Sequence, residues 1–292
     1  MVVSIDDLTC LDALIWLSRG DVAAEKINAS QSSISRVARR VAEDFGVELI
    51  KGEQEWHLLG DTRYLDLERA LHQRMRWDCS GALRLEAQYY SGPLRTKELG
   101  PEFLLGNFDF LDVNRPVDLM HRGVLDVWLA GYPDVPEPND PELQCFDLTR
   151  MPLKLVVSNN HPLIELGDAV RLSDVSDYPC LALQDGAFPK VQRKLEDLGL
   201  WNSPARIRRY KPEKWLGRTS DQVTVGYASA FSIALFPETM VCLPIELDFT
   251  VGECLVVKRE YANHLRFKQF LELMQERSID LAASFDDVSV AF

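Results

Sequence analysis

The sequence has few of the features that mark secreted, membrane-spanning or zinc-binding proteins. Its 292 residues include only six cysteines, the closest two are twelve positions apart, and there is no Cys-x-x-Cys. Such scattering excludes a disulfide framework and a zinc site, and it suits a reducing cytosol. No apolar run approaches the ~20 residues of a membrane-spanning helix. Residues 1–8 lack the basic start and apolar stretch of a signal peptide. We therefore expect a cytoplasmic protein without a membrane partner.

The motifs of common enzyme sites are also missing. The sequence contains no Gly-x-Gly-x-x-Gly, no Walker A loop and no Gly-x-Ser-x-Gly, and its five histidines are dispersed. Asp109, Asp112 and Asp126 could ligate a metal in principle, but their setting is loop and strand edge. The sequence therefore favours a protein that is not an enzyme and has no metal or cofactor.

Length and charge limit the remaining classes. A chain of this size corresponds to about two domains. Thirty-two Lys and Arg stand against 45 Asp and Glu, which gives a formal net charge of −13. This balance argues against a broadly basic surface for non-specific adhesion to nucleic acids or membranes, but it leaves room for one small basic face.

The first 60 residues form a distinct region, because they contain no proline while all 15 prolines fall from Pro93 onward. The spacing of apolar residues predicts helices over 6–18, 22–27 and 31–45. Residues 28–30 form a turn, and Ser30 is a good N-cap for the third helix. After Gly46, alternating residues predict short strands over 47–51 and 55–59. This order describes a helix-turn-helix followed by a hairpin, or wing.

The third helix has two unlike faces. One face is apolar and consists of Ile34, Val37, Ala38, Val41 and Phe45. The opposite face is polar and basic, and such a face can enter a major groove. For reading base edges or positioning the helix we assign Gln31, Ser32, Ser35 and Arg36. For phosphate contacts we assign Arg39, Arg40 and Lys51. The alternative is a small helical subdomain whose arginine face is merely solvated.

Three groups of residues in this region resemble the N-terminal winged helix-turn-helix of LysR-type transcriptional regulators, a bacterial family. They are Ala23-Ala24, the run Ser-Gln-Ser-Ser-Ile-Ser-Arg over 30–36, and Phe-Gly-Val-Glu-Leu-Ile over 45–50. The chain departs from the family pattern at Gly52, where an arginine is usual, and the turn before Ala23 is about two residues shorter. The length and the order of the remaining segments also match, so the resemblance covers nearly the whole chain.

Residues 61–77 predict an amphipathic helix that needs a partner. Tyr64, Leu67, Leu71 and Met75 recur at three- and four-residue spacing, without an intervening glycine or proline. The helix could pack onto its own domain. The resemblance instead implies pairing with the same helix of a second subunit, in a homodimer or homotetramer. Two recognition helices would then meet double-stranded DNA at a roughly palindromic operator.

From Gly81 onward, strand-like and helix-like runs alternate, which indicates an α/β domain. The predicted strands cover 82–87, 124–129, 153–157, 180–183, 222–225 and 254–257, and the clearest helices cover 189–198 and 265–277. These residues could form one sheet or two. The tail over 285–292 has no clear assignment.

The resemblance implies two Rossmann-like subdomains similar to a type 2 periplasmic binding protein, so that the whole chain combines α+β and α/β parts. The expected division is a DNA-binding domain over 1–60, a linker helix over 61–80 and an effector-binding domain over 81–292. Within the last, one subdomain covers 81–153 and 247–292, and the other covers 154–246.

Small molecules bind such folds at strand C-termini, in the cleft between subdomains. The candidate effector residues are Gln88, Tyr89, Tyr90, Ser91, Gly131, Tyr132, Gln184, Asp185, Gly226 and Tyr227. The tyrosines among them suggest an aromatic or planar effector. The sequence thus predicts a DNA-binding transcriptional regulator that senses a small molecule. Two alternatives remain, namely a divergent member of the family that acts through a protein partner, and an enzyme built on the two-subdomain α/β fold.

Overall fold

The computed structural model of the chain describes residues 2–52, 55–79, 81–204, 209–211, 223–235 and 238–292. Among these residues, no helix is both long enough and apolar enough to cross a membrane. Residue 222, in the strand predicted over 222–225, lies outside the described residues.

The N-terminal region is the predicted helix-turn-helix with a wing. Its elements are α1 (Ile5–Leu17), α2 (Gly20–Lys26), α3 (Gln31–Asp44), β1 (Glu48–Lys51) and β2 (Trp56–Leu59). Ser30 caps α3, since its hydroxyl accepts the Ser33 N–H at 3.2 Å. The two strands pair antiparallel, with Glu48 opposite Leu59. Local signals of spacing and capping were therefore sufficient to predict this region.

The linker helix α4 (Arg63–Asp78) buries its polar face and exposes its apolar one. The buried residues on it are Leu65, Glu68, Arg69, His72, Gln73, Arg76 and Trp77. The apolar stripe points outward, with Tyr64 71%, Leu67 69% and Leu71 43% exposed. One side of the helix packs on its own chain, while the apolar stripe is not covered by any described residue, so pairing with a second subunit stays a prediction.

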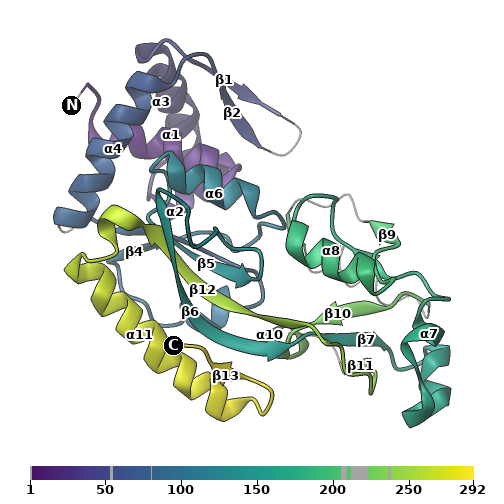
Figure 1. The fold of residues 1–292 in the computed structure, drawn as a ribbon. Helices are drawn as coiled ribbons and strands as arrows, with labels where there is room; N and C mark the ends of the chain where they lie inside the picture. Colours follow the sequence, from purple (N-terminus) through teal and green to yellow (C-terminus); the bar gives the residue numbers. More distant parts are fainter. Residues whose placement is uncertain (1, 53–54, 80, 205–208, 212–222, 236–237) are drawn as a thin grey trace.

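A six-stranded sheet forms the centre of the larger domain (Figure 1). Its order is β13 (Ser289–Val290), β6 (Leu143–Pro152), β12 (Thr250–Lys258), β5 (Val127–Tyr132), β3 (Leu83–Ala87) and β4 (Phe103–Leu105). Strand β3 lies parallel to both β4 and β5, and β12 runs antiparallel to its neighbours β5 and β6. The unassigned tail thus supplies the edge strand β13.

The strand expected over 124–129 begins and ends about three residues later. Val124 and Leu125 instead form a turn, in which both N–H groups donate to the carbonyl of Leu119. Their apolar side chains are buried without belonging to a strand. Gly131 and Tyr132 are consequently the last residues of β5 and not a loop after it.

Each face of this sheet is covered by a different part of the chain (Figure 1). Strand β5 alternates, since Val127 and Leu129 pack with the residues of α11 (Leu265–Ser284). Trp128 and Ala130 point the other way, towards α6 (Asn114–His121) and the helix-turn-helix. This period of two is the normal geometry of a strand that is buried on both faces.

A second subdomain runs from β7 (Lys154–Ser158) to β11 (Met240–Cys242). Strand β7 lies between β10 (Gly226–Ala228) and β11, antiparallel to both. The other elements are η1 (Pro162–Ala169), α7 (Leu172–Val175), β8 (Leu181–Ala182), α8 (Pro189–Asp197), β9 (Ser203–Pro204) and α10 (Ala230–Ile233). The chain enters this subdomain at Leu153, between β6 and β7, and returns between β11 and β12. Two α/β subdomains therefore follow the helix-turn-helix and linker, which confirms the predicted fold class.

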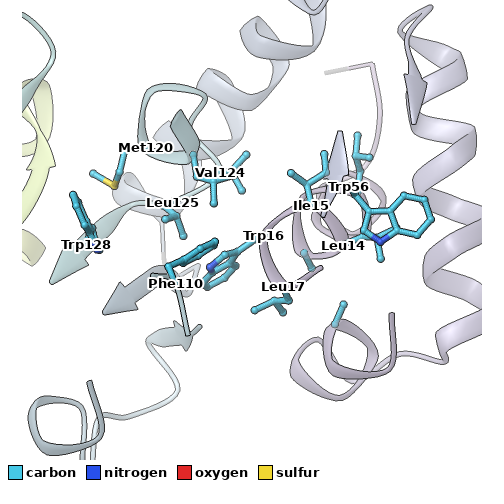
Figure 2. Close-up of a cluster of buried hydrophobic side chains, with 14 of the residues drawn as sticks. Leu14, Ile15, Trp16, Leu17, Trp56, Phe110, Met120, Val124, Leu125 and Trp128 are labelled. Carbon is cyan, nitrogen blue, oxygen red and sulfur yellow. The ribbon is translucent and has the colours of Figure 1, made fainter. Parts of the chain in front are cut away.

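The helix-turn-helix and the first subdomain share one hydrophobic core (Figure 2). Leu14, Trp16 and Leu17 of α1 belong to the same buried cluster as Phe110 and Leu125 of the larger domain. Trp16 is completely buried. The helix-turn-helix is therefore packed onto the larger domain and is not joined to it by a tether alone.

Candidate functional site

The outer face of α3 carries most of the residues predicted to contact DNA. Gln31, Ser32, Arg36 and Arg39 are exposed, and Ser35 is half-buried beside α2. The opposite face is fixed in the core, where Ile34, Ala38 and Val41 are completely buried. Because α1 lies between α3 and the six-stranded sheet, this polar face is directed away from the rest of the molecule (Figure 1).

The basic residues predicted to contact phosphates have different partners within this chain. Arg40 forms an ion pair with Asp7 of α1, at 2.7 Å between Nη2 and Oδ1. Arg36 and Arg39 form no ion pair with any residue that the structure describes. Lys51 is exposed at the wing, with its Nζ 5.8 Å from the centre of the Trp56 ring. Arg36, Arg39 and Lys51 are therefore the cations best placed to meet phosphates or guanine edges.

A cavity of about 90 Å³ lies between the two subdomains of the larger domain. Since a water molecule needs about 10–15 Å³ of such volume, the cavity has room for a small organic molecule in place of several waters. Six of the ten residues predicted for effector binding line it, namely Gln88, Tyr89, Tyr90, Gly131, Tyr132 and Tyr227. Both subdomains supply walls, as expected for a cleft ligand.

The other four predicted residues lie away from the cavity lining. Ser91 is completely buried at the N-cap of α5 (Gly92–Arg95), and its side chain makes no capping hydrogen bond there. Gln184 follows β8, and the neighbouring Asp185 accepts the indole N–H of Trp201 at 3.1 Å. Gly226 is buried within β10, where it pairs with Val156. Gly226 and Tyr227 belong to the strand itself, so the expectation that they follow it is wrong.

The residues that sequence reasoning missed are almost all apolar. They are Leu111, Leu153, Leu183, Phe188, Val191, Ala228, Ser229, Ser232 and Val251. In the sequence, a leucine that lines a cavity has the same pattern as one inside a core. Only Ser229 and Ser232 carried a local signal, since each caps the other's backbone N–H at the start of α10.

The described walls of the cavity are uncharged. None of the lining residues that the structure describes is Asp, Glu, Lys or Arg. Burial raises the pKa of the Tyr89, Tyr90 and Tyr227 hydroxyls, so the three phenols stay neutral at physiological pH. Tyr89 and Tyr90 meet edge to face, with their ring centres 5.3 Å apart. The site offers aromatic surface and neutral hydrogen-bonding groups.

Buried polar contacts join the helix-turn-helix to the larger domain. Asp12 of α1 lies between Arg69 and Arg84, with one N–O distance of 2.8 Å to each. Burial disfavours its ionised form, but the two guanidinium groups outweigh burial and hold the pKa of Asp12 below its ordinary value. Four residues along α1, Trp16 donates its indole N–H to Glu86 at 2.6 Å. The helix-turn-helix therefore has specific polar anchors on β3, the strand that leads into the cavity.

Alternate residues of β3 and of the position after it form a short series on one face of the sheet. Arg84 contacts Asp12, Glu86 contacts Trp16, and Gln88 lines the cavity. Residues two apart on a strand point to the same side, so the series follows from the pleat alone. One strand face thus connects the helix-turn-helix with the cavity.

The comparisons with known proteins agree with this architecture. The sequence profile of the LysR substrate binding domain matches residues 107–279. A comparison with curated protein sequences found no match.

Three solved structures illustrate the likeness of the whole chain. Full-length OxyR from Pseudomonas aeruginosa, a cysteine mutant, is 13% identical with a TM-score of 0.56, and the match covers 98% of each chain. A hydrogen-peroxide-bound OxyR mutant from Corynebacterium glutamicum is 17% identical with a TM-score of 0.54, over 96% of this chain and 95% of that one. Full-length CbnR in complex with its target DNA is 16% identical with a TM-score of 0.53, over 94% and 100%. At these identities the likeness shows the fold.

Proposed function

Because the chain belongs to the LysR family of transcriptional regulators, we propose that it binds a specific DNA site and adjusts that binding to a small-molecule effector. The observation that carries this proposal is the exposed polar face of α3, held outward by a buried apolar face on a helix-turn-helix. The solved CbnR complex with its target DNA supports it, since that protein shares the fold. A chromosomal target would place the protein in the cytoplasm.

The position of each residue on α3 decides whether we assign it to base edges or to phosphates. Gln31, Ser32, Ser35 and Arg36 lie in the first half of the helix, the part that meets base edges when such a helix enters a major groove. Arg39 lies one helical turn after Arg36, and Lys51 lies on the wing. Arg39 and Lys51 are therefore assigned to phosphates. Arg40 reaches a phosphate once it leaves Asp7.

The second copy of the chain is proposed to pack on α4. The exposed stripe of Tyr64, Leu67 and Leu71 is apolar, while the opposite face of the helix already holds buried ion pairs with its own chain. A helix that buries charged residues while it exposes Leu67 and Leu71 departs from the usual amphipathic arrangement. Isologous packing of two such stripes would bury them and present two α3 helices to a roughly palindromic site. Dimers of dimers would give a homotetramer.

The effector is proposed to be an uncharged or weakly charged molecule with an aromatic or planar part. Neutral phenol rings wall the cavity, and the described walls lack a charge to balance a carboxylate or an amine. Burying an unpaired charge is costly, so such a cavity discriminates against it. Its binding would shift the population of arrangements that the two subdomains adopt, and hence the position of the DNA-binding regions.

The decisive experiment is selection of bound fragments from sheared genomic DNA of the source organism, with the full-length protein at near-physiological salt. A recovered site of roughly two-fold symmetry would establish the regulator function, and neighbouring genes would indicate the effector pathway. Recovery of only non-specific fragments would reject it.

A second candidate function is supported by specific features of the DNA-binding region. Residues 1–60 hold ten acids and six Lys or Arg, Gly52 replaces a usual arginine, and Arg40 is engaged by Asp7. These features fit a divergent member that acts through a protein partner. Phosphate contacts release counterions, so the affinity for DNA must fall steeply with salt if the first function is right. An affinity for DNA that hardly changes with salt would favour the second function, in which the protein acts through a protein partner.

A further inference from the structure

Arg209 joins the second subdomain to the helix-turn-helix. It lies between β9 and β10 in the chain, yet its Nη2 is 2.9 Å from the Ser18 hydroxyl and 3.3 Å from the Trp16 carbonyl oxygen. The same nitrogen is 3.5 Å from Glu55, the residue before strand β2 of the wing. Trp16 and Ser18 are at the end of α1 and Glu55 is in the turn between β1 and β2, so one guanidinium contacts both the helices and the wing.

The Arg209 side chain is held firmly in this position. Only 8% of its surface is exposed. Its Nη1 donates to Asp109 at 2.6 Å, and its guanidinium lies 3.7 Å from the centre of the Phe110 ring. A planar cation that is stacked, paired and bonded to a backbone carbonyl has little freedom to follow a different partner. A movement of its backbone is therefore transmitted to α1 and the wing.

The next residue, Tyr210, contacts the wall of the cavity. Its ring stacks on Tyr89, with centres 3.8 Å apart and planes inclined by 16°. Its N–H donates to the carbonyl of Asp109 at 2.6 Å, which fixes the backbone between the two side chains. Tyr89 lines the cavity. Neighbouring residues of the second subdomain thus contact the proposed effector site on one side and the DNA-binding region on the other.

We propose that Arg209 and Tyr210 form the coupling pair that transmits occupancy of the cavity to the helix-turn-helix of the same chain. This inference rests on the proposed function. A ligand between the subdomains changes the position of Tyr89 against Tyr210, and Arg209 carries that change to Ser18, Trp16 and Glu55. Coupling between two sites typically alters affinity by about 5- to 150-fold. Arg209 acts as a positioning residue and contacts neither DNA nor effector.

The test uses a substitution in place of the unidentified effector. Ala228→Phe introduces a ring into the cavity from the buried strand β10. Arg209→Met keeps an apolar stem over Phe110 but removes the guanidinium contacts. Amide hydrogen exchange of the full-length protein without DNA is measured for the wild type, both single variants and the double variant. Arg193→Met, at an exposed position on α8, is the control for the arginine change and is measured with and without Ala228→Phe.

If the pair couples the two sites, Ala228→Phe should change amide hydrogen exchange at the end of α1 and in the wing by at least about fivefold. This change should occur in both backgrounds that retain Arg209, the wild type and the Arg193→Met control. In the Arg209→Met background the change should fall below about twofold. An equal change with and without Arg209, or no change at α1 and the wing in the wild-type background, overturns the coupling. If Ala228→Phe fails to fold, Gly131→Ala replaces it, because a Cβ there would lie 2.8 Å from the Tyr90 hydroxyl and displace it. These readouts need no DNA, so the fragment selection separately decides the proposed function.

Discussion

Trp16 and Glu86, 70 residues apart in the sequence, form a buried hydrogen bond of 2.6 Å between α1 and β3. The Glu86 carboxyl also accepts the backbone N–H groups of Ala87 at 3.1 Å and Phe108 at 2.9 Å. A Cβ on Gly106 would lie 2.2 Å from its Oε2, so only glycine fits there. The DNA-binding region is therefore anchored by a buried carboxyl that accepts hydrogen bonds from Trp16, Ala87 and Phe108.

Glu86 should make the stability of the protein depend on pH. Burial, the largest cause, raises the pKa of this carboxyl from 4.5 to about 7. The folded state then holds a proton that the unfolded state releases, so this stabilisation is complete below about pH 4.5 and is lost as the pH rises through 7. At 1.36 kcal/mol per pH unit the loss is about 3 kcal/mol.

The measurement is urea unfolding at several pH values between 4.5 and 8. Glu86→Gln cannot titrate, so its free energy of unfolding should fall less with rising pH over this window than that of the wild type. Glu98→Gln, on an exposed side chain, is the control and should leave the slope unchanged. Identical slopes for Glu86→Gln and the wild type would contradict the prediction.

Arg95→Ala should destabilise the fold strongly. Arg95 and Glu253 are completely buried, with 2.5 Å between Nη2 and Oε2, and the same guanidinium donates to Ser278 at 2.7 Å. Removing one partner leaves a buried, uncompensated charge, which typically costs about 3–5 kcal/mol. The midpoint of urea unfolding measures the loss. Lys97→Ala breaks only an exposed pair with Glu98 and should leave the midpoint in place; equal effects of the two variants would refute the prediction.

Leu67→Glu should weaken self-association of the full-length protein. Leu67 is 69% exposed at the centre of the apolar stripe on α4. A buried leucine contributes about 1.5–3 kcal/mol, so its loss corresponds to a dimer dissociation constant at least about tenfold higher. Sedimentation velocity over a range of concentrations gives this constant. Leu265→Glu alters a leucine of almost equal exposure, 67%, at the start of α11; a similar loss with this control would reject α4 as the interface.

Arg36→Ala should weaken specific DNA binding by about 1–3 kcal/mol and relax selectivity at one base position. Arg36 is exposed on α3 and has no ion pair within the described residues, so its removal leaves the fold intact. Fluorescence anisotropy with a selected fragment and with a scrambled one measures both effects. The control is Arg193→Ala, on α8 of the second subdomain, which should bind both DNA fragments like the wild type. Equal affinities of Arg36→Ala and the wild type would show that this arginine does not read DNA.

Features set by neighbouring residues were predictable from the sequence. The helix-turn-helix follows from a spacing of three and four, from the cap at Ser30 and from the stop at Gly46, which all act locally. Two strands that bound the cavity were expected too early in the chain. Strand β5 begins three residues after its predicted start, because buried apolar side chains in the turn at Val124 mimic a strand. Strand β10 covers Gly226–Ala228, after the strand predicted over 222–225. The division into two α/β parts followed from the resemblance of the chain and not from its composition.

Contacts between distant segments were decided by the tertiary structure alone. Nothing near Trp16 in the sequence indicates Glu86, and nothing near Ser18 indicates Arg209, 191 residues away. The apolar stripe of α4 was visible, but only packing shows that the polar face of that helix is the buried one. The sequence by itself determined the local elements and the family, because caps, periods and turns act over a few residues. Which faces meet, which leucines line a cavity and which charges become anchors depend on burial, and burial exists only once the whole chain is packed.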